Sequence, residues 1–333
     1  MRYRILQIVL LALVYVNLGL FGQTDRNNKI ALTEVLTIGD TLGSTFSEVG
    51  DIAIDSQENI YVTDRYQFAI KKFSQNGNLL AEYGKRGKEV GEFQSGPARI
   101  ELSDNSVAVS DVGTSKIVLL TKELQPTGDF NTVGPIVDIA QFRGDHICCS
   151  VLTLSGDASE ILAVYSKNGE VTKRVPVMDP SSMTTLQVLW LCGDHMNGLI
   201  AAYGFRNRIM VYDSSMRLIS SFRVTGLPDE APTDTIAEGK FGVVPKLELI
   251  RAVAVYPDSL IFVLGGDFSS HPSRDVYVFD YRGNLLETCL LPHETGLLYI
   301  DAKGFLYTRE HDKTLIRKYR MKLSNRYKEK VVK

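Results

Sequence analysis

Several arginine and aromatic side chains stand at or just after short apolar runs, where loops are expected to begin; Arg65 and Tyr66, for example, follow Ile60–Asp64. A guanidinium group recognises carboxylates and phosphates through paired hydrogen bonds, and an aromatic face stacks on sugars or peptide side chains. We therefore expect a set that binds an anionic peptide or an acidic sugar: Arg65, Tyr66, Tyr203, Phe205, Arg206, Arg274 and Arg309. The alternative is that these are ordinary loop residues, with the arginines paired to Asp64, Asp111 or Asp267.

Histidine supplies a second candidate site. Three of the five histidines, His271, His293 and His311, lie in loop-like segments toward the C-terminal end. Three imidazoles can hold a catalytic zinc with an open position for water or substrate. No His-x-His or His-Glu-x-x-His spacing supports this trio. The expectation is therefore no cofactor, and zinc or calcium is the alternative that the trio leaves open.

Other patterns that carry chemistry are missing from the sequence. It has no nucleophile elbow, phosphate loop or paired-acid motif. The 37 basic and 39 acidic residues nearly balance, so the net charge implies no nucleic-acid partner. The sequence leans toward a protein that is not an enzyme. Four cysteines show neither metal-ligand spacing nor a dense disulfide framework, and their disulfide state stays open: Cys148, Cys149, Cys192 and Cys289.

A repeat of short strands must position the candidate residues. An apolar segment recurs six times, and the first residues of successive copies are 47, 40, 52, 61 and 45 residues apart. Another strand-like run precedes each copy and a third follows it, and five of the six units then continue into a fourth run. Spacings of 40 to 47 residues suit a unit of four strands and their turns, and the two longer spacings, 52 and 61 residues, imply insertions. The six segments are Ile60–Asp64, Val107–Asp111, Ile147–Val151, Leu199–Tyr203, Leu260–Leu264 and Phe305–Arg309.

Six units of four antiparallel strands predict an all-β chain, a six-bladed β-propeller over residues 23–320. The sixth unit is one strand short at its end, whereas an extra strand-like run, Ile30–Ile38, precedes the first unit. We predict that this N-terminal run supplies the outer strand of the last blade. The competing choice, Lys322 to Val332, is rich in Lys and Arg, so residues 321–333 are expected to form a basic C-terminal tail.

The unit from Asp51 to Tyr83 resembles the NHL-repeat propellers. It carries Ile60–Asp64, Ile70–Phe73 and the turn Asn76-Gly77, and the glycine-containing link from Tyr83 to Pro97 matches that family's connection between blades. The likeness is good over residues 50–125 and continues afterwards as strand pattern alone. The whole chain is similar to exported bacterial six-bladed propellers related to NHL and TolB-type propellers.

This resemblance implies where the candidate residues lie. In such propellers the first strand of each blade lines a central channel. The loops between second and third strands share one face, here named the top face, with the links between blades. The arginine and aromatic set and the histidine trio would then gather on the top face. Some NHL-type propellers are lyases with a metal in the channel, although their ligands come from several blades around the axis.

The N-terminus is typical of a secretory signal peptide. Arg2 and Arg4 precede an uncharged, mostly apolar stretch from Ile5 to Gly22, and a polar run follows it. We predict cleavage after Gly22 and an exported protein, periplasmic or extracellular, with no membrane span after cleavage. The alternative is an uncleaved anchor, because ~17–20 apolar residues can just span a bilayer.

Two further features have structural and functional interpretations. The long link from Thr225 to Glu248 is expected to be either a lid, with Lys240 and Phe241 facing ligand, or a flexible excursion. Asp64 and Asp111 end equivalent strands and are expected to accept hydrogen bonds from loop backbone. Aromatic residues that close the third strands are expected to pack between blades: Phe73, Tyr165, Tyr212, Phe279 and Tyr319.

The leading hypothesis is an exported, non-catalytic binding propeller that recognises a peptide, protein or glycan through its top-face loops. The alternative is a metal-assisted lyase or hydrolase at the mouth of the central channel. A third hypothesis is a sensor or scaffold in an envelope assembly, whose basic tail from Lys318 contacts acidic lipid or a partner.

Overall fold

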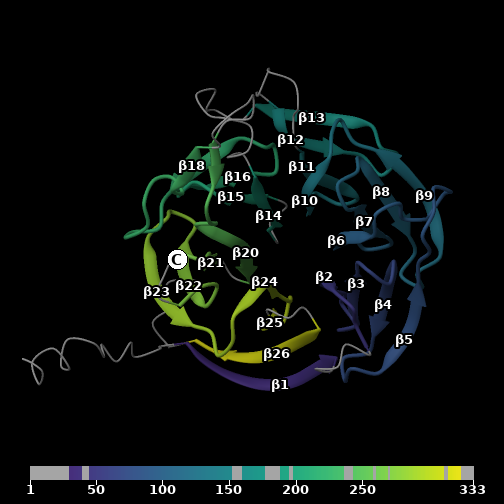
Figure 1. The fold of residues 1–333 in the computed structure, drawn as a ribbon, viewed down its shortest axis with the longest axis horizontal. Helices are drawn as coiled ribbons and strands as arrows, with labels where there is room; N and C mark the ends of the chain where they lie inside the picture. The colour runs from purple at the N-terminus through teal and green to yellow at the C-terminus, as the bar shows by residue number, and fades with distance from the viewer. Residues whose placement is uncertain are drawn as a thin grey trace, which may run out of the picture.

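Six four-stranded antiparallel sheets form a ring around a central axis (Figure 1). The computed structural model describes residues 30–39, 45–151, 160–176, 188–194, 198–235, 243–257, 260–268, 271–310 and 314–323. Each sheet is one blade, and in five blades the strands follow chain order from the axis outward. The prediction of an all-β, six-bladed propeller is therefore confirmed.

The strand bounds agree with the repeat. Blade 1 holds β2 (Val49–Ile54), β3 (Ile60–Asp64), β4 (Ala69–Phe73) and β5 (Leu79–Tyr83). Blade 2 holds β6 (Pro97–Leu102), β7 (Val107–Asp111), β8 (Lys116–Leu120) and β9 (Pro126–Asn131). Blade 3 holds β10 (Ile136–Phe142), β11 (His146–Val151), β12 (Glu160–Tyr165) and β13 (Val171–Pro176). Blade 4 holds β14 (Leu189–Gly193), β15 (Leu199–Tyr203), β16 (Ile209–Tyr212) and β17 (Leu218–Phe222). Blade 5 holds β20 (Ile250–Tyr256), β21 (Leu260–Gly265), β22 (Asp275–Asp280) and β23 (Leu285–Leu290). Blade 6 holds β24 (Thr295–Ile300), β25 (Phe305–Glu310), β26 (Leu315–Lys322) and β1 (Ala31–Gly39).

The N-terminal strand completes the last blade, as predicted. β1 pairs antiparallel with β26, from Ala31 opposite Lys322 to Gly39 opposite Leu315, so the first and last strands lie side by side (Figure 1). This pairing joins the two ends of the ring and satisfies the outer edge of β26, which would otherwise expose unpaired backbone groups.

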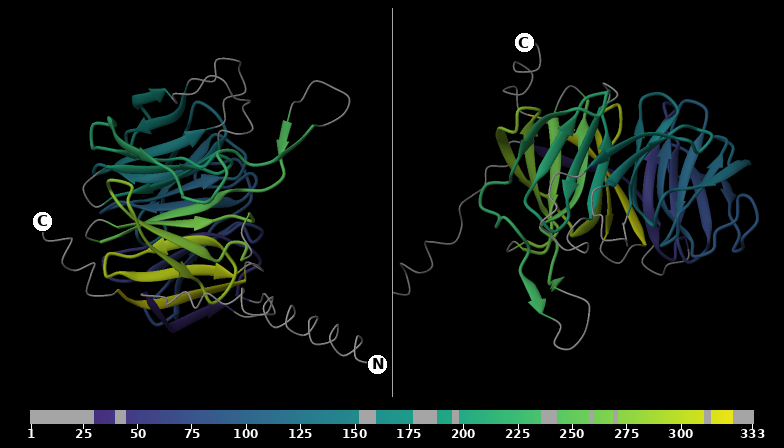
Figure 2. Two further views of the ribbon diagram at one scale, coloured as in Figure 1. Left: turned by 90° about the vertical axis from the view of Figure 1, so that its left-hand side faces the viewer. Right: turned by 90° about the horizontal axis from the view of Figure 1, so that it is seen from above.

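The long link between blades 4 and 5 contains a small hairpin. β18 (Thr233–Thr235) pairs with β19 (Val243–Pro245), and the hairpin stands out from the ring (Figure 2). Lys240 and Phe241, the residues expected to face a ligand, lie outside the described residues, as do the signal-like segment, residues 1–22, and most of the basic tail.

The hydrophobic core is divided among the interfaces between blades. Six clusters of buried side chains each join two neighbouring blades, and the one between blades 6 and 1 contains Phe46, Phe73 and Tyr307. Full burial of one such side chain stabilises the fold by roughly 1.5–3 kcal/mol. The second strands β3, β7 and β15 are buried along their whole length, because they have a blade on each side. The aromatic residues closing the third strands pack in these clusters, as expected.

Glycine turns between the third and fourth strands press against the preceding blade. Gly169 and Gly283 have φ angles of 80° and 84°, a left-handed conformation that favours glycine. A Cβ atom on Gly283 would lie 2.6 Å from the side chain of Phe222, which belongs to blade 4. These turns therefore need glycine both for the backbone angle and for the close approach.

In the part of the chain that the structure describes, no helix is present that is long and apolar enough to cross a membrane.

Candidate ligand-binding site at the channel mouth

Three adjoining cavities run along the axis of the ring. A central cavity of about 250 Å³ is lined by the six innermost strands, β2, β6, β10, β14, β20 and β24. A second cavity of about 250 Å³ opens at the top mouth, between the loops after the second strands and the links between blades. A third, of about 500 Å³, opens at the bottom mouth, between the turns that join first and second strands. The top cavity and the central cavity share Arg99, Trp190, Arg251 and Gly296, so they are continuous.

Register shifts in the innermost strands place charged residues at the top mouth. The pairing of β2 with β3 shifts between Val49 and Ile52, that of β6 with β7 between Pro97 and Ile100, and that of β20 with β21 between Ile250 and Ala252. Asp51, Arg99 and Arg251 lie within these three irregular stretches. A bulge interrupts the alternation of side chains along a strand and changes the direction in which a residue points. All three side chains line the central cavity.

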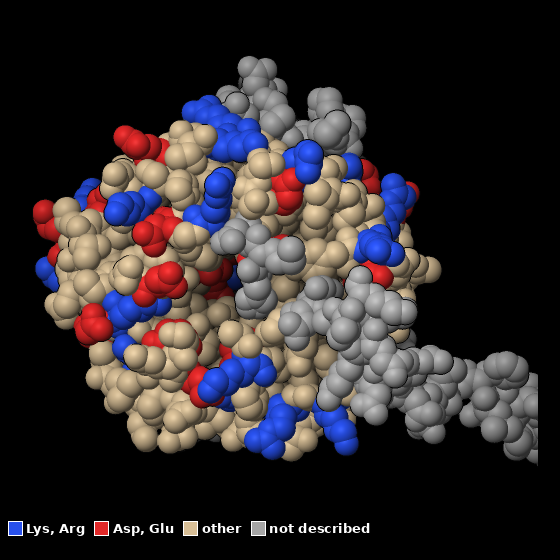
Figure 3. All heavy atoms as spheres, turned by 180° about the vertical axis from the view of Figure 1, so that it is seen from behind, with Lys and Arg blue, Asp and Glu red and all other residues tan. Residues whose placement is uncertain are grey.

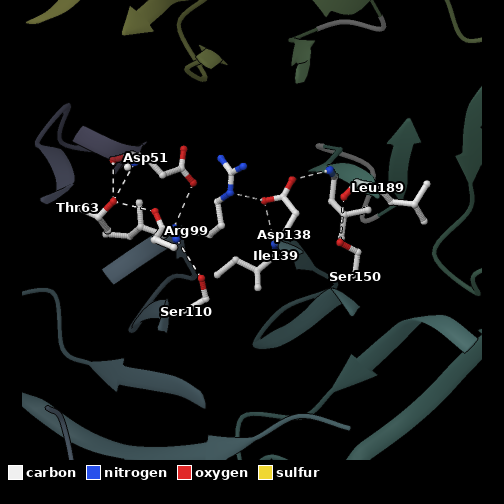
Figure 4. Close-up of polar contacts among 12 residues, drawn as sticks. Asp51, Thr63, Arg99, Ser110, Asp138, Ile139, Ser150 and Leu189 are labelled. Atoms are coloured by element: carbon white, nitrogen blue, oxygen red, sulfur yellow. Dashed lines mark hydrogen bonds and ion pairs between the residues drawn. The ribbon is translucent and has the colours of Figure 1, made fainter. Parts of the chain in front are cut away.

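Hydroxyl groups on the second strands satisfy the backbone groups that the shifts leave unpaired. Thr63 Oγ1 accepts a hydrogen bond from the backbone N–H of Asp51 at 2.8 Å and donates to the carbonyl of Ala98 in the next blade, also at 2.8 Å (Figure 4). Ser110 Oγ accepts from the N–H of Arg99 at 3.0 Å. Because buried backbone groups are costly when unpaired, these hydroxyls stabilise the irregular strands that carry the charges.

One guanidinium group lies between two carboxyl groups inside the channel. Arg99 Nε is 3.2 Å from Asp138 Oδ1, its guanidinium lies over the ring of Trp190 at 5.0 Å, and Asp51 lies on its other side (Figure 4). Asp51 and Asp138 also accept backbone hydrogen bonds from Ile100 and Leu191, each in the following blade. The two acids therefore tie innermost strands together and fix the arginine.

The channel disfavours ionised acids. Burial raises the pKa of Asp138 to about 6 although Arg99 opposes this effect, and burial likewise raises the pKa of Asp51. Removal from water, and then the neighbouring charges of Asp51 and Asp138, raise the pKa of Glu101 well above its ordinary value. Burial lowers the pKa of Arg99, but Asp138 and Asp51 outweigh it and the pKa is raised.

Two further arginines, Arg251 and Arg309, lie together at the top mouth. Arg309 is only 9% exposed, and its Nη1 donates to the carbonyls of Val49 and Gly50 at 2.7 and 2.9 Å, across the junction of the last and first blades. Arg251 Nη1 donates to Glu248 Oε2 at 2.6 Å. A Cβ atom on Gly296 would lie 2.4 Å from Arg309 Nη2 and 3.5 Å from Arg251 Nε, so both guanidinium groups lie over this glycine.

The arginine and aromatic set predicted from the sequence is only partly brought together. Arg65 and Arg309 line the top cavity, and Tyr66 is 65% exposed beside Arg65. Three others lie in packing contacts of blade 4: Tyr203 is buried, Phe205 packs on a core cluster, and Arg206 is buried with Glu230 as an ion-pair partner at 3.5 Å. Arg274 donates to the carbonyl of Leu291 at 2.8 Å, away from the cavity.

The histidine trio is only partly within the described residues. His293 is exposed, with Nδ1 3.8 Å from Glu310 Oε1, and His271 is partly buried, whereas His311 lies outside the described residues. Among the residues that the structure describes, no group of three or more His, Cys, Asp or Glu side chains is arranged to hold a metal ion. The trio as a metal site therefore stays a prediction.

Asp64 and Asp111 have the structural role expected of them. Asp64 accepts hydrogen bonds from the N–H groups of Ser47 and Glu48, and Asp111 from those of Gln94, Ser95 and Gly96. They anchor equivalent links between blades. The four cysteines are free thiols, and burial raises the pKa of each.

The bottom mouth mixes charges of both signs. Its cavity is lined by Lys72 and Lys122 together with Asp55 and Asp104, and both lysines lie near the ring of Tyr61. Figure 3, which views the molecule from the side opposite to Figure 1, likewise shows acidic and basic side chains interspersed around a central hollow. The top mouth differs in its balance of charge, because four arginines (Arg65, Arg99, Arg251 and Arg309) line its cavity together with two glutamates, Glu48 and Glu248.

Sequence reasoning did not single out Arg99, Arg251, Asp51 or Asp138. All four lie within or beside innermost strands, where alternation alone does not tell which side chains face the axis. The available signal was a charged residue near the start of several otherwise apolar first strands: Asp51, Arg99, Asp138 and Arg251.

No protein-family model and no curated protein matches the sequence. Solved structures do resemble the fold. A Bacteroides fragilis protein for which export has been suggested shares 10% identity with a TM-score of 0.61, over 91% of this chain and 97% of that chain. A member of the DUF4221 family from Bacteroides vulgatus shares 10% identity with a TM-score of 0.60, over 89% and 99% of the two chains. A streptogramin B lyase shares 12% identity with a TM-score of 0.57, over 88% and 97%. At these identities the likeness shows the six-bladed fold alone.

Proposed function

We propose that this protein is an exported, non-catalytic propeller that binds an anionic peptide, protein or glycan at the top mouth of its channel. The observation that carries the proposal is the top cavity of about 250 Å³, which Arg65, Arg99, Arg251 and Arg309 line. Guanidinium groups are the side chains best suited to bind carboxylates through two parallel hydrogen bonds.

The construction of this mouth favours binding. Arg309 is held by two carbonyls of blade 1, and Arg99 is held between Asp138 and the ring of Trp190. Side chains that are already fixed lose little conformational freedom when a ligand arrives, and this raises affinity. The exposed pair Arg65 and Tyr66 extends the site onto the top face.

Export is the second part of the proposal and rests on the N-terminal sequence. The basic start and the apolar stretch through Gly22 support it. The mass of the protein recovered from cells tests it: a mature chain that begins at Gln23 is expected, and a chain that retains residues 1–22 would instead support the anchor.

Direct binding measurements test the function. The purified protein would be titrated with arrays of acidic peptides and uronic-acid oligosaccharides, together with their neutral analogues. We expect saturable binding of acidic probes, weakened at least tenfold by the double change Arg65→Ala and Arg251→Ala. Arg217→Ala is the matched control, because Arg217 is exposed on the turn between β16 and β17.

Two results would overturn this function. One is no saturable binding of any acidic probe, and the other is equal weakening by the Arg217 control. Elemental analysis of the same preparation tests the alternative, a metal-assisted lyase or hydrolase. Stoichiometric zinc or calcium that is lost on changing His271 and His311 to alanine would favour that alternative.

A further inference from the structure

Arg309 is a buried cation, and one of its N–H donors has no hydrogen-bond partner among the described residues. Its side chain is about nine-tenths buried, and its two hydrogen bonds to Val49 and Gly50 use Nη1 only. The Nε atom is buried and has no hydrogen-bond partner among the described residues. No carboxylate in the described part of the chain lies within ion-pair distance of this guanidinium. A buried donor without a partner costs roughly 1–3 kcal/mol, and more when it is charged, so a bound acceptor near this guanidinium would stabilise the protein.

The guanidinium group of Arg251 lies beside that of Arg309, above Gly296. Arg251 Nε and Nη2 each lie 3.5 Å from the position that a Cβ atom of Gly296 would take, and Arg309 Nη2 lies 2.4 Å from it. Burial, and then the positive charge of Arg99, lower the pKa of Arg309 to about 10, and Arg251 adds to this effect. The protein therefore holds like charges together over a residue without a side chain, an arrangement that an anion would stabilise.

We propose that Arg251 and Arg309 form a seat above Gly296 for one carboxylate group of an acidic peptide. This inference rests on the proposed function and names the chemical group that the top mouth recognises. The seat opens into the top cavity of about 250 Å³, which has room for an acidic side chain or a chain end. Arg65 and Tyr66 then contact neighbouring residues of the peptide on the top face.

The surroundings of the seat favour a singly charged group. Glu48 and Glu248 line the same cavity, and Glu248 already binds Arg251. A phosphate carries nearly two negative charges and would be repelled by these carboxylates more strongly than a carboxylate would. The mouth is therefore matched to one negative charge.

The aromatic residues near the mouth favour a peptide over a sugar. Sugar rings bind on open aromatic faces, but Arg99 lies over the ring of Trp190, and Trp190 Nε1 donates to the carbonyl of Ile250. Tyr203 is buried and Phe205 packs on the core. Of the aromatic residues predicted to bind ligand, only Tyr66 keeps an exposed ring, and Arg65 lies over it.

The test compares blocked tripeptides that differ in one group. Acetyl-Gly-Glu-Gly-amide and acetyl-Gly-Gln-Gly-amide would be titrated into the purified protein by NMR, with acetate and inorganic phosphate as further probes. We expect saturable binding of the glutamate peptide, at least tenfold weaker binding of the glutamine peptide and of phosphate, and weaker binding of acetate than of the glutamate peptide.

Two variants locate the seat without removing Arg309, whose contacts join the blades. Gly296→Ala keeps every charge and fills the space, because the new methyl group would lie 2.4 Å from Arg309 Nη2 and must push that atom aside. Arg251→Gln removes one cation. Each is expected to weaken binding of the glutamate peptide at least tenfold, and Arg217→Gln is expected to have no effect. Arg251→Gln leaves the contacts of Arg309 with Val49 and Gly50 in place, so its unfolding temperature should stay close to that of the wild type.

The outcomes separate this inference from the proposed function. Equal binding of the glutamine peptide, or unchanged binding in both Gly296→Ala and Arg251→Gln, would overturn the seat even if Arg65→Ala still weakened a ligand and so upheld the top mouth. Binding of acetate as tight as the peptide would overturn the peptide assignment, and tighter binding of phosphate would overturn the carboxylate. No binding by any acidic probe in the wider arrays would instead reject the proposed function.

Discussion

Acidic side chains inside the channel should make the stability of this protein depend on pH in an unusual direction. Burial raises the pKa of Asp138 to about 6, against about 4 in an unfolded chain. The folded state therefore binds more protons than the unfolded state between these values, and the free energy of unfolding falls as pH rises through this window. Asp51 and Glu101 have raised pKa values and act in the same direction.

We predict that Asp138→Asn reduces this pH dependence. In the wild type, the ionisation of Asp138 should lower the free energy of unfolding by roughly 2 kcal/mol between pH 4 and pH 7. The variant lacks that group, so its loss over the same range should be smaller by a similar amount. Urea unfolding at pH 4, 5, 6 and 7 measures both. An equal fall of the free energy of unfolding with pH in the two proteins would contradict a buried Asp138 that binds a proton in this range.

The residues of the mouth show what could be predicted from sequence at this scale. Arg65 and Arg309 were identified because each stands at the end of a second strand and a guanidinium group recognises carboxylates, and both line the top cavity. Tyr203 ends a strand too, but that strand is buried by blades on both sides. Arg99 and Arg251 could not be identified, because a register shift of one or two residues decides their direction. At Arg99 this irregular stretch also includes a hydrogen bond to the hydroxyl of Ser110 in the neighbouring strand.

Elements were predictable wherever local sequence determines them. The second strands Ile60–Asp64, Val107–Asp111 and Leu199–Tyr203 have the bounds expected from their apolar runs. The turns followed from Gly, Asn and Asp residues. The hairpin of β18 and β19 was expected only as a lid or an excursion, because its two strands have three residues each and lie in a polar link.

The turn of blade 5 provides a prediction at this scale. Gly283→Ala should destabilise the protein, because alanine must adopt a φ of 84° and its Cβ would lie 2.6 Å from the side chain of Phe222. Gly144→Ala is the matched control, since its φ is 68° and nothing lies within 4 Å of the added atom.

Urea unfolding of the two alanine variants separates the contact from the backbone strain. The free energy of unfolding of the Gly144→Ala control should fall by about 1 kcal/mol, and that of Gly283→Ala should fall by at least 1 kcal/mol more. Equal losses would show that Phe222 moves aside without cost.

For the whole molecule, the closed ring was predictable from a count of strands. The sixth unit lacked one strand and the N-terminus offered one, and β1 pairs with β26 as that argument requires. The route of the channel and its three cavities could not be predicted, because they depend on how six blades with unequal links pack together.

Removal of β1 should weaken the whole ring. A chain that begins at Thr45 loses Ile30 and Ile38, which are 1% and 5% exposed, at a cost on the order of 3–6 kcal/mol from their burial alone. A chain that begins at Lys29 is the control and should unfold like the full chain. Thermal unfolding and light scattering measure the effect, and the shorter chain should melt earlier and aggregate through the exposed edge of β26. An unchanged melting temperature would mean that β1 adds nothing to the ring.

The pairing of the first strand with the last also constrains how the molecule is made. β1 leaves the ribosome before any blade exists, and its partner β26 is among the last segments to be synthesised. Until β26 is available, β1 has no partner for its backbone hydrogen bonds, whereas blades 1 to 5 can already assemble on their neighbours. A chain that stops before Leu315 can never join its ends, so ring closure distinguishes a finished molecule from an interrupted one.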